Sequence, residues 1–171
     1  MRKLRKMKKL LVALMMVLPM CASAQKFGHF DSAAVIQSMP EYTTAQNEVQ
    51  AKAKTYEDEL KRMQDEFRTK AEDYEKNQAT LIEDVKKRRE QELQELNQRL
   101  QEYYNKSQQD LNQLQGEKLQ GIQQKLVKAV EEVGQAGGYV YIMDTSAGIP
   151  YISKSLSTDV TSQVKAKLGI K

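Results

Sequence analysis

The feature that most limits the fold of this chain is a run from Glu41 to Val133 that contains no proline and only two glycines. Proline breaks helices and glycine weakens them, so a stretch of this length without them favours α-helix. Lysine, glutamate, glutamine and leucine are abundant in it, and the whole chain has no tryptophan. This composition is typical of an extended helical protein rather than of one with a large compact core.

Apolar side chains recur in the first half of the run at spacings of four and three residues, which is the heptad pattern of a coiled coil. The second half carries the pattern in mirror order, so folding the chain back near Ala79–Thr80 pairs the two halves. Tyr56 then faces Tyr103, and Lys70 faces Glu90, in a register that is open by one heptad. The predicted seam contains Val49, Tyr56, Leu60, Met63, Phe67, Leu93, Leu96, Leu100, Tyr103 and Leu111.

Two observations place the turn in the stretch Asn77–Asp84. Thr80 and Glu83 have the spacing of a capping box, which starts a helix. One unbroken helix over the run would be about 140 Å long and would separate the β-forming segments at its two ends. A hairpin arm of about 55–60 Å reunites these segments within one chain. An antiparallel dimer of straight rods would reunite them between chains and stays the structural alternative.

The segments on either side of the run predict a small body that contains strands. Lys26–Asp31 and Tyr139–Asp144 read as strands, and residues 149–153 read as a further one. A short helix capped by Asp31 or Ser32 ends at Pro40, and a last helix is capped by Thr158 or Asp159.

The expected core of this body consists of apolar residues from its strands and first helix, namely Phe27, Phe30, Val35, Ile36, Val140 and Ile142. A body of about 60 residues is small for independent stability, so we expect it to associate with further copies. The sequence therefore predicts an α+β fold, mostly α, with a long antiparallel helical hairpin that projects from a small β-rich body through which copies associate.

The two glycines of the run, Gly116 and Gly121, lie where the predicted arm leaves the body. Each costs about 1 kcal/mol of helix stability relative to alanine. They indicate either a hinge that lets the arm swing or a close approach of two helices.

Residues 1–24 have the layout of a secretory signal peptide: a basic start, an apolar stretch too short for a permanent span, and the small-residue sequence Ala22–Ala24. We expect cleavage after Ala24 and export to the periplasm, with an uncleaved anchor or lipidation at Cys21 as alternatives. Six of the 27 Lys and Arg residues and none of the 23 Asp and Glu residues lie in this segment, so the mature chain carries a net charge of −2. The basic total of the whole chain is therefore no argument for nucleic-acid binding.

No catalytic constellation is visible in the sequence. The mature chain has no cysteine, and its single histidine, His29, lies in a short predicted strand. No G-x-x-x-x-G-K-[ST] phosphate loop is present, and the carboxylates are spread along helix faces. We expect no enzyme activity, no cofactor and no metal.

The two ends of the mature chain resemble those of the Skp/OmpH family of periplasmic chaperones. The first is the stretch from Lys26 to the Pro-Glu-Tyr sequence at Pro40–Tyr42, and the second runs from Gly137 to Leu168 with Asp144 and Asp159 in it. The resemblance implies a homotrimer whose arms surround a cavity for unfolded outer-membrane β-barrel proteins. It also implies that these proteins are held without ATP until membrane insertion.

We expect the mature chain to divide into the N-terminal part of the body at 25–40, an arm at 41–118 with its tip near 77–84, and the rest of the body at 119–171. Family members are often strongly basic, whereas this mature chain is not. The candidate contacts to unfolded proteins or to an anionic lipid surface are Tyr104, Lys86, Lys87, Arg88 and Arg89. The rival interpretations are a structural coiled-coil spacer or adaptor of the cell envelope and a hydrolytic or cell-wall enzyme.

Overall fold

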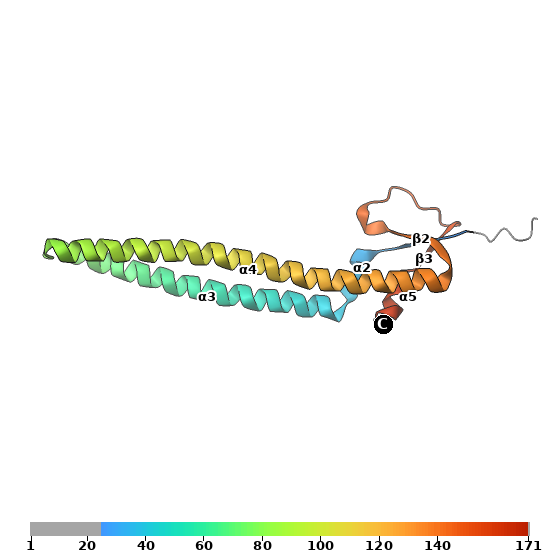
Figure 1. The fold of residues 1–171 in the computed structure, drawn as a ribbon, viewed down its shortest axis with the longest axis horizontal. Coiled ribbons are helices and arrows are strands. Elements are labelled where there is room, and N and C mark those ends of the chain that lie inside the picture. The colour runs from blue at the N-terminus through green and yellow to red at the C-terminus, as the bar shows by residue number, and fades with distance from the viewer. Residues whose placement is uncertain (1–24, 171) are drawn as a thin grey trace, which may run out of the picture.

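The computed structural model describes residues 25–170 as a long helical hairpin that projects from a small body of short strands and helices (Figure 1). Helix α3 spans Pro40–Asn77 and helix α4 spans Glu83–Gly137. At 1.5 Å per residue, α3 is about 57 Å long. The expected fold class is confirmed. The expected signal peptide and Cys21 lie outside the described residues.

The arm begins where proline interrupts the helical backbone. Helix α2 (Ser32–Ser38) starts at Asp31, whose Oδ1 accepts a hydrogen bond from the Ala34 backbone N–H at 2.9 Å. Met39 is extended, as the residue before a proline prefers, and Pro40 is the first residue of α3.

None of the helices in residues 25–170 is long and apolar enough to cross a membrane.

The chain reverses between α3 and α4, within the stretch that the sequence pattern indicates. The predicted capping box is wrong, because Ile82 stands at the start of α4 without a side-chain cap. Thr80 Oγ1 instead donates to the Asn77 carbonyl at 2.9 Å and so closes the outgoing helix. Glu83 and Asp84 occupy the first turn of α4, where negative charge is favourable.

Three parallel strands form the sheet of the body in the order β2-β1-β3. They are β1 (Lys26–Phe30), β2 (Tyr139–Asp144) and β3 (Ser157–Asp159). The strand predicted at residues 149–153 is wrong, since this segment is irregular and Tyr151 is exposed. The edge of β1 that does not pair with β2 pairs with β3, where Gly28 lies opposite Thr158.

One face of the sheet is covered by helices. The base of α4, helix α2 and helix α5 (Thr161–Lys167) pack together there, and Gly138 ends α4 in the left-handed conformation with φ 64°. The buried side chains at this junction are Phe30, Val35, Leu126, Ala129, Val133, Val160 and Val164. A second, smaller cluster of Met39, Ala45 and Ile122 fills the shoulder where the arm meets the body.

The expected core residues occupy three different environments. Phe30 and Val35 are buried, and Ile36 and Ile142 pack at the edge of the same cluster. Phe27 lies on the opposite face of the sheet. Val140 lies outside the core of the single chain, because its side chain is 57% exposed, and its place in an interface between copies stays a prediction.

A register shift in the sheet accounts for the position of Val140. Lys26 pairs with Tyr139 but Phe27 pairs with Tyr141, so β2 has one residue more than β1 at this step. The extra residue interrupts the alternation of faces that the predicted strand assumed. Tyr139 and Ile142 therefore contact the core cluster, and Val140 faces away from it.

Candidate functional site

The seam of the arm follows the predicted heptad positions. Leu96 is fully buried and the other nine predicted seam residues are half-buried between α3 and α4. The rings of Tyr56 and Tyr103 meet edge to face, with centroids 5.9 Å apart. Tyr56 Oη also donates to Asp110 Oδ2 at 3.0 Å. The hairpin register is therefore the one in which these two tyrosines are opposite each other.

The polar pairing nearer the tip differs from the prediction. Lys70 forms an ion pair with Glu92 and not with Glu90, so the Lys70–Glu90 assignment is wrong. Glu90 accepts a hydrogen bond from Tyr74 Oη at 2.6 Å, which raises the pKa of Tyr74. A lysine side chain is long enough to reach either of two glutamates that are two residues apart. The heptad spacing alone therefore does not predict which of them it pairs with.

The tip of the arm combines an apolar residue with a basic cluster. Ile82 is 71% exposed at the start of α4. Lys86 is half-buried one turn later, and Lys87, Arg88 and Arg89 are exposed. Arg89 is 3.3 Å from Glu92, so part of this charge is paired within the arm.

Tyr104 lies beside the seam and not in it. Its side chain is 53% exposed, while the neighbouring seam residue Ser107 is buried. Ser107 Oγ satisfies its hydrogen-bonding capacity by donating to the Tyr104 carbonyl at 2.8 Å. The phenol ring is therefore available to a partner on one flank of the arm.

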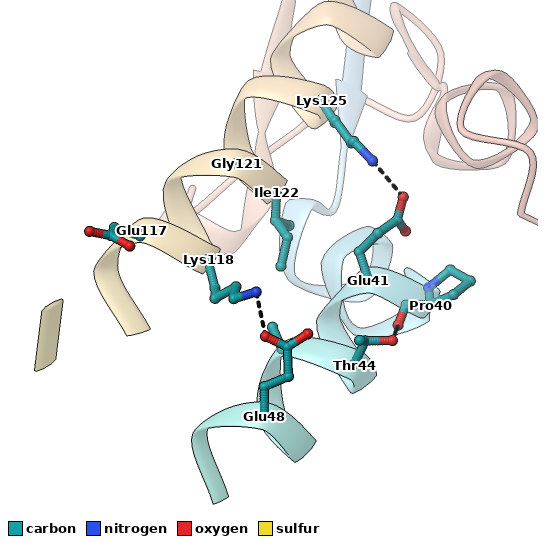
Figure 2. Close-up of a pocket in the computed structure, with 10 residues that line it drawn as sticks. Pro40, Glu41, Thr44, Glu48, Glu117, Lys118, Gly121, Ile122 and Lys125 are labelled. Atoms are coloured by element: carbon teal, nitrogen blue, oxygen red, sulfur yellow. Dashed lines mark hydrogen bonds and ion pairs between the residues drawn. The ribbon is translucent and has the colours of Figure 1, made fainter. Parts of the chain in front are cut away.

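Ion pairs join the two helices at the shoulder (Figure 2). Glu41 accepts a hydrogen bond from Lys125 at 2.8 Å, which lowers the pKa of Glu41, and Glu48 pairs with Lys118. Ile122 points between these pairs into a hollow of about 390 Å³.

The predicted hinge glycines lie in α4 at and near this hollow. A methyl group at Gly116 or Gly121 would meet no atom within 4 Å among the described residues. Close helix packing within the chain therefore does not explain the glycines, and the hinge stays a prediction.

The sheet face opposite the helices is apolar and uncovered. Phe27 and Tyr141 stack on it with ring centroids 4.8 Å apart. His29 lies on the same side of β1 and its Nδ1 is 2.8 Å from Ser157 Oγ. Together with the β2–β3 connection, this face exposes Tyr141, Met143, Tyr151 and Leu156. We call these residues and Phe27 the apolar sheet face.

The carboxyl ends of the strands carry three aspartates, a position where parallel sheets often bind ligands. Asp31, Asp144 and Asp159 are instead engaged by backbone N–H groups of the chain itself. Burial would raise the pKa of Asp144, but hydrogen bonds from Ser32 and Ser146 outweigh it and lower the pKa. Within residues 25–170, no three His, Cys, Asp or Glu side chains gather in a metal-binding cluster.

Comparisons with known proteins agree with this architecture. The family model described as outer membrane protein (OmpH-like) matches residues 26–168. A crystal structure from Caulobacter crescentus, described as an OmpH-like outer membrane chaperone, superposes with a TM-score of 0.74 at 17% sequence identity. The match covers 84% of this chain and 83% of that one, and it shows a shared fold. No curated protein matches. The chain belongs to the OmpH-like family.

Proposed function

We propose that this protein is an ATP-independent holdase of the periplasm that binds unfolded outer-membrane β-barrel proteins between its helical arms and keeps them from aggregating before insertion. The observation that carries the proposal is the arm itself, a two-helix hairpin of about 57 Å that is exposed along its length. Membership of the OmpH-like family and the fold shared with an outer membrane chaperone support it.

The chemistry of the arm suits a passive holder. The apolar seam is thin and mostly half-buried, and the outer faces are polar. Such a surface offers many weak contacts to an extended chain, and their sum is useful when several arms act together. Because each contact is weak, the bound protein leaves without an energy source.

We propose that the apolar sheet face joins three copies into a homotrimer. Phe27 and Tyr141 form an aromatic surface on it, and Met143 is 45% exposed beside them. Exposed apolar surface of this kind is typical of protein contacts. The resulting arrangement places the bodies together and leaves the arms free to surround a cavity.

The holdase proposal is tested by diluting a urea-unfolded outer-membrane β-barrel protein into buffer with and without the mature chain, in the absence of ATP. We expect light scattering to stay low when the chain is in molar excess. Unchanged scattering, together with binding to a folded envelope partner, would contradict the proposal and favour the spacer alternative.

The trimer proposal is tested separately by light scattering after size-exclusion chromatography. Tyr141→Asp places a charge on the apolar sheet face, and we expect it to release monomers. Gln109→Asp, an exposed position on the outside of α4, serves as the control and stays trimeric. A wild-type monomer would contradict the proposal.

We propose a lesser role for the tip, as a contact to anionic lipid or to acidic segments of the bound protein. Ile82 precedes α4 and the basic residues 86–89 lie in its first turns, and α4 begins at the end of the arm that is farthest from the body (Figure 1). Basic residues near an anionic surface gain about 1 kcal/mol each. Replacing Lys86–Arg89 by glutamate tests the role, because unchanged binding to anionic vesicles would exclude it.

A further inference from the structure

A groove on one flank of the arm is lined without any charged side chain. It has a volume of about 410 Å³ and we call it the distal groove. Leu100 and the exposed Tyr104 supply its apolar surface, and four carboxamides surround them. Its lining residues are Gln64, Asn97, Leu100, Gln101, Tyr104 and Asn105.

A second groove nearer the body, the proximal groove, is also lined mainly by apolar and carboxamide side chains. Its volume is about 500 Å³, and Tyr42, Val49 and Leu119 supply the apolar surface. Lys118 is its one charged lining residue and is paired with Glu48. The carboxamides around it are Gln46, Asn47, Gln50 and Gln115.

The two grooves lie on the same flank of the hairpin. Gln46 and Gln64 are 18 residues apart on α3, and Asn97 and Gln115 are 18 residues apart on α4. Eighteen residues make about five turns of 3.6 residues, so the two members of each pair point in the same direction. The grooves are therefore displaced along the arm by about 27 Å.

Their chemistry matches an extended polypeptide backbone. A carboxamide both donates and accepts hydrogen bonds, so it can bind a peptide N–H or a peptide C=O whatever the side chain. The amides bind each other weakly, since the hydrogen bond among these side chains in the described chain, from Gln101 Nε2 to Asn97 Oδ1, is 3.4 Å long. A tyrosine ring beside a leucine offers a place for an aromatic side chain.

The spacing selects a length of chain. An extended segment rises by about 3.4 Å per residue, so about eight residues span the 27 Å between the grooves. The lack of unpaired charge disfavours charged side chains, which would lose hydration without gaining a partner. Strands of β-barrel proteins have a matching pattern, with about ten residues between two girdles of aromatic side chains.

We propose that the distal and proximal grooves together bind one extended, uncharged segment of an unfolded polypeptide through two aromatic side chains about eight residues apart, with its backbone hydrogen-bonded by the flanking carboxamides. This inference rests on the proposed holdase function and specifies the part of the unfolded protein that the arm recognises.

The first experiment uses a peptide as the probe. A Gly/Ser peptide with two tyrosines separated by eight residues is titrated into the mature chain, and the side-chain amide resonances of Asn and Gln are followed by NMR. We expect the resonances of Gln101 and Gln115 to move, and those of Gln109 and Gln120 to stay in place. A peptide with adjacent tyrosines should bind about tenfold more weakly, because it reaches one groove at a time.

The second experiment compares two double variants with the same added charge. Gln101→Glu/Gln115→Glu changes one carboxamide in each groove, whereas Gln109→Glu/Gln120→Glu changes two exposed glutamines of α4 that lie in neither groove. We expect the groove variant to bind the spaced peptide about 25-fold more weakly, as for two lost hydrogen bonds, and the control to bind normally. Tyr104→Ala should behave like the groove variant.

The outcomes separate the grooves from the holdase function. Equal resonance shifts at all four glutamines, or equal binding by both double variants, would overturn the groove proposal even if the chain keeps an unfolded β-barrel protein in solution. Failure to keep that protein in solution, with the peptide still bound at the grooves, would overturn the holdase function and leave the grooves in place. Circular dichroism verifies that all variants are helical.

Discussion

The arm and the body of this protein are held together in different ways. In the body, seven buried side chains from strands and helices meet in one cluster around Phe30 and Val35. In the arm, α3 and α4 share a seam whose side chains are mostly half-buried, with Leu96 and Ser107 as its fully buried members. Stabilisation by apolar burial is thus concentrated in the body, whereas in the arm each residue contributes a small amount. This division suits the proposed holdase function, in which an adaptable arm is attached to a rigid body.

The largest expected difference comes from truncating one leucine in each region. Leu126→Ala empties part of the body core and should cost about 2–5 kcal/mol, with loss of cooperative unfolding of the body. Leu100→Ala in the half-buried seam should cost clearly less and increase amide hydrogen exchange near the site. Chemical denaturation and hydrogen exchange measured by mass spectrometry check both. Equal losses would remove the distinction between the two regions.

Substitution of Asp144 tests how much the hydrogen bonds at the carboxyl end of β2 stabilise the body. Asp144→Ala removes the acceptor for the Ser32 and Ser146 backbone N–H groups, and we expect a loss of about 1–2 kcal/mol. Because the pKa of Asp144 is lowered in the folded protein, its stabilisation is present above about pH 4 and is lost as the pH falls through the folded value. The variant should therefore lose less stability on acidification than the wild type in thermal unfolding.

Gly121→Ala tests whether this glycine makes the shoulder between the arm and the body flexible. The position is helical and has open space for a methyl group, so we expect a gain of about 1 kcal/mol. If the glycine serves as a hinge, the distance distribution between spin labels on the tip and on the body should also narrow. An unchanged distribution would exclude the hinge, and a loss of stability would contradict the helical geometry there.

The smallest effect is expected from the ion pair at the shoulder. Glu41→Gln removes the pairing with Lys125, which is exposed, so the cost should stay below about 1 kcal/mol. The pKa of Glu41 is lowered chiefly by the hydrogen bond from Lys125, so this contribution is present above about pH 4 and is lost at lower pH. Salt should lower the stability of the wild type more than that of the variant, which keeps the Glu48–Lys118 pair. Equal salt dependence of the two proteins would show that the Glu41–Lys125 pair does not stabilise the shoulder.

Local patterns in the sequence were enough to predict the arm. The alternation of three and four residues indicates which face of each helix is buried, and the mirror order of Tyr56 and Tyr103 places the turn to within one heptad. The same spacing continues at the base of α4, and its residues there are buried: Ile122, Leu126, Ala129 and Val133. This continuation of the heptad pattern could have added them to the predicted core of the body.

The body was less predictable, because its arrangement depends on contacts between distant segments. A register shift between Lys26 and Phe27 turned Val140 outward, and no local pattern shows it. The residues around Tyr151 have high β-propensity but form no strand. Ser157–Asp159 pair with β1 in their place. The two grooves combine residues of α3 and α4, so they become visible only once the hairpin register is known.

Native mass spectrometry of the mature chain, alone and after dilution of an unfolded outer-membrane β-barrel protein into it, tests the central claim most directly. The account predicts a trimer that takes up one unfolded protein without ATP. A dimer or monomer that leaves the unfolded protein to aggregate would contradict it.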